Sequence, residues 1–173
     1  MSFPKFDLQG VCLDSVCFTL DGHVQGIAKF ESLDGAPATV TMNLASTLTL
    51  QRPDATPLVV TIPLAQTVDN VTAYDGVTDF AGTSGKTYPS LSGDKAESFC
   101  THASADLALF TGAGNIVLPV VATGTSNGSG AGNLILQFAT DASAGASVTY
   151  YYETCPVPAQ PTTWGRLKQL IRR

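Results

Sequence analysis

The stretch VTMNLASTLTL (40–50) alternates apolar and polar residues, and this alternation decides the fold class. Apolar side chains occupy every second position from Val40 to Leu44, and the pattern resumes at Leu48 and Leu50. A repeat of two residues is typical of a β-strand that has one buried and one solvent-facing side. The stretch therefore predicts a half-buried strand.

The same alternation recurs along the chain, and turn-forming motifs separate its occurrences. Further apolar residues at every second position are Val16, Phe18 and Leu20, then Ile116, Leu118 and Val120, then Val148, Tyr150 and Tyr152. Residues that favour turns occur in LDGH (20–23), LDGAP (33–37), RPDATP (52–57), YDGVTD (74–79), TGAGN (111–115) and SNGSGAGN (126–133). Short strands at this spacing predict an all-β chain, an antiparallel β-sandwich of the jelly-roll or immunoglobulin-like (Ig-like) kind.

Two segments depart from the strand pattern. ESFCTHASADLALF (97–110) has helical character, and we expect a loop there that can contain a short helix. The run 76–93 is rich in Gly, Ser and Thr and has few apolar residues, which predicts a long surface loop. The LDGH motif places His23 in a turn, where we expect it to be exposed to solvent.

A chain of 173 residues can bury one core, so we expect a single β-sandwich domain at 1–154. Three prolines in CPVPAQP (155–161) predict an extended spacer. Residues 162–173 predict a short amphipathic C-terminal helix, and so short a helix is unstable alone in water. We expect it to fold against a partner, or alternatively to cover an apolar patch on its own sandwich. This attachment tail has an apolar face of Trp164, Leu167, Leu170 and Ile171 and the basic residues Arg166, Lys168, Arg172 and Arg173.

Charge divides the chain into an acidic body and a basic tail. All fourteen acidic residues lie at or before Glu153, together with five of the nine basic ones, so the body carries −9 and the tail +4. An acidic body is a poor partner for nucleic acid. The sequence contains no run of about twenty apolar residues, so it predicts no transmembrane segment. The stretch MSFPKFDLQG (1–10) does not resemble a signal peptide, and we expect that an export signal was removed or lies outside this sequence.

The four cysteines predict disulfides. Cys12, Cys17, Cys100 and Cys155 form an even set whose spacing matches no zinc finger or ribbon. Disulfides form in oxidising compartments, which favours an extracellular or cell-surface location. Four cysteines allow three pairings, and the sequence alone leaves all three open.

No catalytic motif is present, and we predict that the protein is not an enzyme. Cys100, His102 and Asp106 are close in sequence, but a thiol held in a disulfide cannot act as a nucleophile. We expect no cofactor, with calcium as the one candidate. Asp69, Asp75 and Asp79 offer the oxygen ligands that calcium uses, although an ordinary acidic turn is the more common explanation of such residues.

Several longer stretches resemble, in order, the bacterial choice-of-anchor E domain family. They are FPKFD (3–7), LDGHVQG (20–26), AYDGVTDFAGTSG (73–85), ADLALFTGAGNIVLPVVATGTS (105–126), GAGNLILQFAT (130–140) and VTYYYE (148–153). The resemblance implies a secreted β-rich domain without known catalytic residues, followed by a C-terminal sorting tail. The segment 161–173 differs from the family's sorting tails because it is charged and has no apolar span.

These observations lead to one main functional expectation and two alternatives. The main expectation is a non-enzymatic extracellular or cell-surface structural module that self-assembles by strand addition into filaments or a surface layer and is attached through its tail. The extended segment 1–9 is a candidate for the added strand. The alternatives are a module that binds glycans or another surface ligand, and an intracellular cargo-like protein whose tail is a docking peptide.

Overall fold

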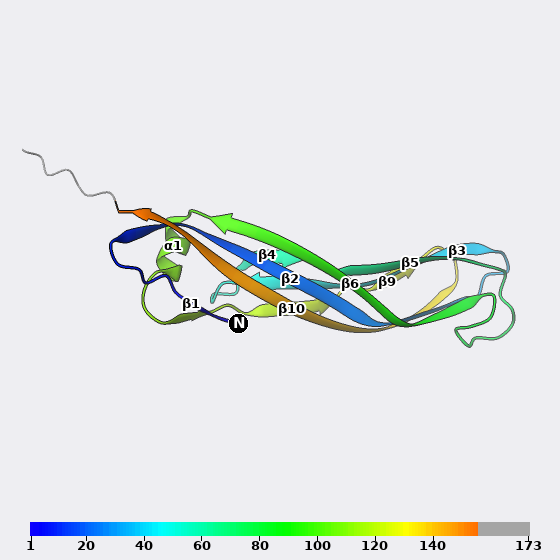
Figure 1. The fold of residues 1–173 in the computed structure, drawn as a ribbon. Helices are drawn as coiled ribbons and strands as arrows, with labels where there is room; N and C mark the ends of the chain where they lie inside the picture. Colours follow the sequence, from blue (N-terminus) through cyan, green and yellow to red (C-terminus); the bar gives the residue numbers. More distant parts are fainter. Residues whose placement is uncertain (156–173) are drawn as a thin grey trace, which may run out of the picture.

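The computed structural model describes residues 1–155, which form an elongated molecule made almost entirely of antiparallel strands (Figure 1). In this part of the chain there is one helix, α1 (Ser104–Phe110). The strands are β1 (Ser2–Pro4), β2 (Val11–Ser32), β3 (Ala38–Gln51), β4 (Pro57–Thr61), β5 (Leu64–Val71), β6 (Gly85–Thr101), β7 (Asn115–Val117), β8 (Val120–Gly124), β9 (Asn127–Ser129) and β10 (Leu134–Thr154).

Three long strands form one sheet in the order β10-β2-β6. The central strand β2 has 22 residues, and its neighbours pair with it in antiparallel register along most of that length. From Val16 to Val24 the even-numbered residues of β2 are buried and the odd-numbered ones lie on the outer face. This alternation is what a strand covered on one side requires.

The second sheet is built around β3. β4 and β5 pair with one side of β3 in the same register from Ala38 to Leu50, with a gap at Ile62 and Pro63 and a register shift after Leu50. β8 and β9 pair with the other side, again in one register, interrupted at Thr125 and Ser126. Each flanking pair therefore acts as one broken strand along β3, which has 14 residues against the 22 of β2.

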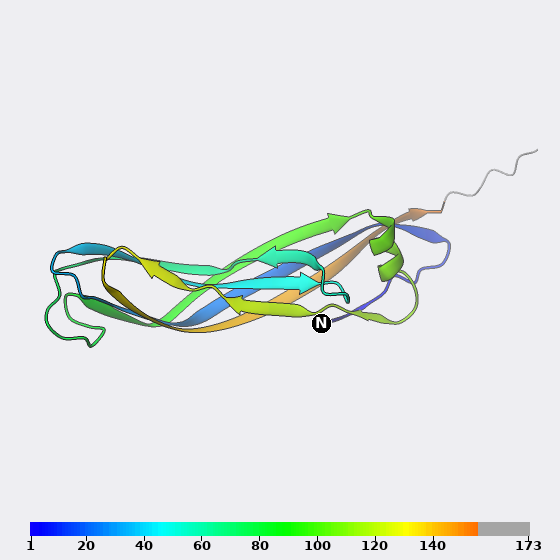
Figure 2. The ribbon, with the colours of Figure 1, turned by 180° about the vertical axis from the view of Figure 1, so that it is seen from behind.

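The two sheets lie one over the other along the long axis of the molecule (Figure 2). The side chains between them form the hydrophobic core. Phe18 and Leu20 of β2 meet Leu48 and Leu50 of β3 near one end. The strand predicted from residues 40–50 is confirmed, and so is an antiparallel, mostly β chain.

The N-terminal segment is held by its own chain, so the expectation that residues 1–9 are free to join a neighbour is wrong. β1 pairs with β7, and the terminal amino group of Met1 donates a hydrogen bond to the carbonyl of Leu118 at 2.7 Å. Phe6 is buried, and its backbone N–H donates to the carbonyl of Phe110. The segment closes the end of the core beside α1.

Two local predictions are corrected. The LDGH motif is not a turn, because β2 runs straight through it. Gly22 points into the core, where a Cβ atom would come within 2.7 Å of the Thr61 side chain and 2.8 Å of the Leu48 side chain. The loop predicted at 76–93 ends at Ser84, since β6 begins at Gly85.

The short helix expected within 97–110 is confirmed at Ser104–Phe110, whereas Glu97 to Thr101 belong to β6. The helix in the described residues is thus internal. The predicted C-terminal helix and every residue of the attachment tail lie outside the described residues, namely Trp164, Arg166, Leu167, Lys168, Leu170, Ile171, Arg172 and Arg173.

Candidate functional site

All four cysteines form disulfides, as predicted, and the structure selects one of the three pairings. Cys12 bonds to Cys155, which follows β10, and Cys17 of β2 bonds to Cys100 of β6. The central strand of the long sheet is thereby linked covalently to both neighbours at the end that carries α1. Two disulfides indicate an oxidising compartment.

The three residues Cys100, His102 and Asp106 do not form a catalytic group. Cys100 is oxidised, and Nδ1 of His102 lies 3.2 Å from the backbone carbonyl of Asp14. Asp106 accepts two hydrogen bonds from the guanidinium of Arg52, at 2.6 and 2.9 Å. The Arg52 hydrogen bonds lower the pKa of Asp106, so the carboxylate anchors α1 to the end of β3 as a charged group.

The calcium candidates have other partners. Asp69 accepts hydrogen bonds from Lys86, at 2.5 Å, and from the hydroxyl of Tyr88. The Asp75 carboxylate accepts a bond from the N–H of Val77, and that of Asp79 one from the N–H of Ala81. These are local turn contacts. Within residues 1–155, no group of three or more His, Cys, Asp or Glu side chains is placed to hold a metal ion.

Glu31 is a buried carboxylate that the sequence did not point to. It is 0% exposed, and it accepts hydrogen bonds from the hydroxyl of Ser84 at 2.6 Å and from the N–H of Phe80 at 2.8 Å. Odd-numbered residues of β2 lie on the outer face of the sheet from Val16 to Val24, so the same alternation predicts that the side chain of residue 31 points outward into solvent. The loop that precedes β6 folds over the Glu31 side chain. These contacts join residues about 50 positions apart, so the sequence around Glu31 does not indicate them.

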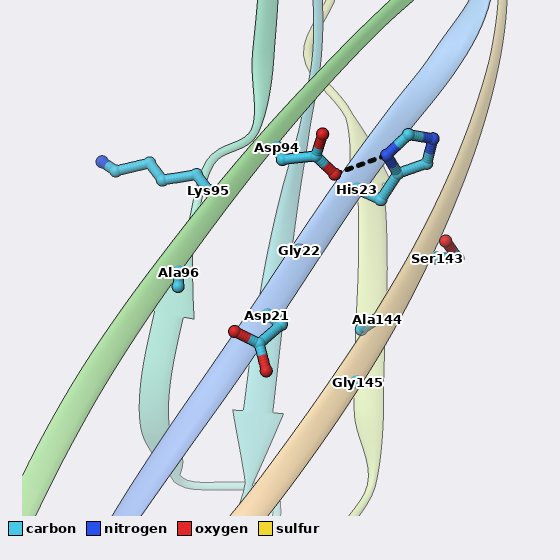
Figure 3. Close-up of a pocket in the computed structure, with 9 residues that line it drawn as sticks. All are labelled: Asp21, Gly22, His23, Asp94, Lys95, Ala96, Ser143, Ala144 and Gly145. Atoms are coloured by element: carbon cyan, nitrogen blue, oxygen red, sulfur yellow. Dashed lines mark hydrogen bonds and ion pairs between the residues drawn. The ribbon is translucent and has the colours of Figure 1, made fainter.

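A shallow hollow of about 520 Å³ lies across the middle of the long sheet (Figure 3). Asp21, His23, Asp94, Ser143 and Gly145 belong to its outer face. The hollow exists because several of its lining residues are Gly or Ala. The Nδ1–H group of His23 donates a hydrogen bond to Oδ1 of Asp94 at 2.6 Å.

The row Ser143, His23, Asp94 contains the residue types of a hydrolase triad but not its geometry. The second ring nitrogen of His23 faces Oε1 of Gln25 at 3.4 Å, and no hydrogen bond joins it to Ser143 among the residues described. A triad needs its nucleophile bonded to the base. The row therefore does not provide an activated nucleophile.

We expect His23 to titrate above the ordinary histidine value. Both ring nitrogens face acceptors, and the Asp94 hydrogen bond, followed by that of Gln25, raises the pKa of His23. The stabilisation by this pair is complete below the ordinary pKa and is lost as the pH rises through the raised one. NMR titration of the His23 ring should show a lower pKa in Asp94→Asn and no change in the control Asp14→Asn. Equal values in wild type and Asp94→Asn would contradict the assignment.

The two edges of the long sheet differ in how they are protected against pairing with another chain. Residues of β6 opposite the buried residues of β2 include Lys86, Lys95 and Glu97, and inward-pointing charges block edge pairing. Pro89 lies where the register of β6 shifts, and proline lacks an N–H donor. The β6 edge is therefore protected by charge, by proline and by a bulge.

The β10 edge has none of these features over most of its 21 residues. It contains no Lys, Arg or Pro, and its charged residues are Asp141 and Glu153. A register shift occurs only near its end, between Tyr151 and Tyr152. Among residues 1–155, the backbone of β10 pairs with β2 alone. This long edge, which carries two acidic residues and no basic one, is the candidate functional site.

Side chains on the inner face of β10 remain partly exposed. None of its residues is fully buried, whereas the inward residues of β2 beside them are. The half-buried apolar side chains that contact the core from β10 are Leu134, Leu136, Phe138, Ala144, Ala146, Val148 and Tyr150. An added strand would complete their burial.

Within residues 1–155, no helix has the length and hydropathy needed to cross a membrane. Comparisons of the chain with models of protein families, with curated proteins and with solved structures found no match. The resemblance to the choice-of-anchor E family stays a prediction.

Proposed function

We propose that this protein is a non-enzymatic structural module of the extracellular space or cell surface, and that it self-assembles by strand addition. The observation that carries the proposal is the β10 edge, which offers unpaired backbone groups and half-buried apolar side chains without a blocking charge. We further propose that the two packed sheets are a β-sandwich.

Two features support an extracellular location. Both disulfides connect strands of the long sheet, and such bonds persist in oxidising surroundings. The outer face of that sheet at the hollow is polar, with Asp21, His23, Asp94 and Ser143 among its residues, a composition suited to a solvated surface. We propose that the basic tail serves attachment or sorting; it lies outside the described residues.

Neither alternative function has comparable support. An intracellular docking cargo would keep its thiols reduced, contrary to the two disulfides. A glycan-binding module needs an aromatic platform or a metal. Tyr151 and Tyr152 are exposed neighbours at the end of β10, but the Tyr152 ring packs against Phe6 with a centroid distance of 5.4 Å.

Sedimentation velocity of the oxidised full chain over a wide concentration range tests the proposal, with negative-stain microscopy of the same samples. We expect association that increases with concentration. Val148→Lys should abolish it, because it places a charge on the inner face of the β10 edge. Phe99→Lys is the matched control, since Val148 and Phe99 lie opposite Phe18 on its two sides. A protein that stays monomeric throughout would contradict the proposal, as would equal loss of association in both variants.

A further inference from the structure

We propose that the β10 edge pairs with the β10 edge of a second copy of this chain, antiparallel and about a two-fold axis. The inference rests on the proposed function and specifies its first contact. Joining the two edges would produce one six-stranded sheet in the order β6-β2-β10-β10-β2-β6. In such a contact both subunits present the same surface.

The sequence of β10 is suited to pairing with itself over its full length. The strand runs from Leu134 to Thr154, so its central residue is Ala144. A fully overlapped antiparallel pair places Ala144 opposite Ala144 of the second copy, within the small residues 142–146. The same register places Phe138 opposite Tyr150 of the second copy, twice in the dimer, and such aromatic cross-strand pairs stabilise a sheet.

Charge favours this register as well. In the fully overlapped pair, Asp141 lies opposite Ser147 of the second copy and Glu153 lies opposite Ile135, so no like charges face each other. A register centred on Ser147 would instead place Asp141 opposite Glu153, and like charges directly opposite each other are destabilising. The positions of the two acidic residues thus select against that slipped pairing.

The other edges of the molecule fit β10 less well. The β6 edge would bring Lys86 and Lys95 to the inner side of the contact and Pro89 into the ladder. β1 is occupied by β7 of its own chain. The flanking strands of the second sheet are short, and Pro63 interrupts one of them. A second β10 is the partner that matches in length and carries no blocking residue.

The two-fold pairing has a geometric result. It is a closed contact, because each β10 edge is consumed by the other. The two strands run in opposite directions, so the two copies of Thr154 lie at opposite ends of the dimer. Any larger assembly would therefore grow through contacts other than β10.

Single added cysteines in the full chain test this register. Under mild oxidation, Ala144→Cys should give a disulfide-linked dimer of twice 18.0 kDa on a non-reducing gel, with the 144–144 link identified by peptide mass spectrometry. Directly opposite residues have Cβ atoms about 5 Å apart, within reach of a disulfide.

Ala142→Cys and Ala146→Cys are the matched controls. In the proposed register, residue 142 lies opposite 146 of the second copy, so two identical cysteines are about 13 Å apart and should not link. A mixture of the two variants should link. A protein that associates without the 144–144 link, or with a 142–142 link, overturns the two-fold pairing and leaves the proposed function standing. A protein that never associates overturns both.

Discussion

Reduction of the two disulfides should lower the melting temperature of the protein by about 15–20 °C. The Cys12–Cys155 bond joins residues 143 positions apart, and the Cys17–Cys100 bond joins residues 83 apart. Cross-links across such long loops restrict the unfolded chain strongly, and each contributes about 3 kcal/mol to the free energy of unfolding. For a chain of this length, one kcal/mol corresponds to roughly 2–4 °C.

Differential scanning calorimetry with and without a reductant measures this effect, with thiols counted after each scan. The paired variants Cys12→Ser/Cys155→Ser and Cys17→Ser/Cys100→Ser remove one bond each and should each produce about half of the loss. The wild type under oxidising conditions is the reference. An unchanged melting temperature in a sample whose four thiols are free would show that the bonds do not stabilise the fold.

Replacing Phe18 by Ala should lower the free energy of unfolding by about 3–5 kcal/mol. The ring is 0% exposed, and its centroid lies 5.0 Å from that of Phe110. It belongs to the cluster that contains Leu48 and Leu118, so its removal leaves a cavity between the two sheets and beneath α1. Urea unfolding followed by circular dichroism gives the free energy directly.

Phe99→Ala is the control for this change. Phe99 lies directly opposite Phe18 in the neighbouring strand, on the same face of the sheet, but it is 41% exposed. Its removal creates little cavity, so the expected loss is about 1 kcal/mol. A similar loss in the free energy of unfolding in the two variants would contradict the assignment of Phe18 to the core between the two sheets.

The alternation of apolar and polar residues predicted a strand well where the strand lies inside its sheet and packs against the other sheet. Val40, Met42, Leu44, Leu48 and Leu50 are all buried in β3, because this strand is paired on both sides and packs on β2. The same rule fails for β6, whose inner positions include Lys86 and Lys95. The second sheet does not fully cover the β6 edge, so the side chains of Lys86 and Lys95 reach solvent. The side chains of β6 still alternate between the two faces of the sheet, but its residues do not alternate between apolar and polar.

Gly22 shows a different limit. An Asp-Gly pair between apolar residues is a strong local signal for a hairpin turn. Here the glycine is required because the side chains of Leu48 and Thr61, from the other sheet, occupy the space that a Cβ atom would need. The contact joins residues far apart in sequence, so the local motif cannot distinguish a turn from a crossing of two sheets.

The candidate site could be predicted only in part for the same reason. Val148 and Tyr150 indicated a strand, but the stretch DASAGAS (141–147) has no apolar alternation and hides the middle of β10. That β10 is an edge follows from the order of the sheet, which is set by long-range register. Disulfide pairing depends on that register as well, and four cysteines were all that the sequence could supply.

The Cys12–Cys155 bond also determines how the molecule responds to mechanical tension. A pulling force applied to the chain directly before Cys12 and after Cys155 travels through the bond between them, so the strands β2 to β10 are not stretched. Once that bond and the Cys17–Cys100 bond are reduced, the same force reaches the strands, and the 143 positions between Cys12 and Cys155 can extend to about 500 Å. The redox state of the two disulfides therefore decides whether this protein acts in a tensed chain as a short inextensible link or as a long compliant one.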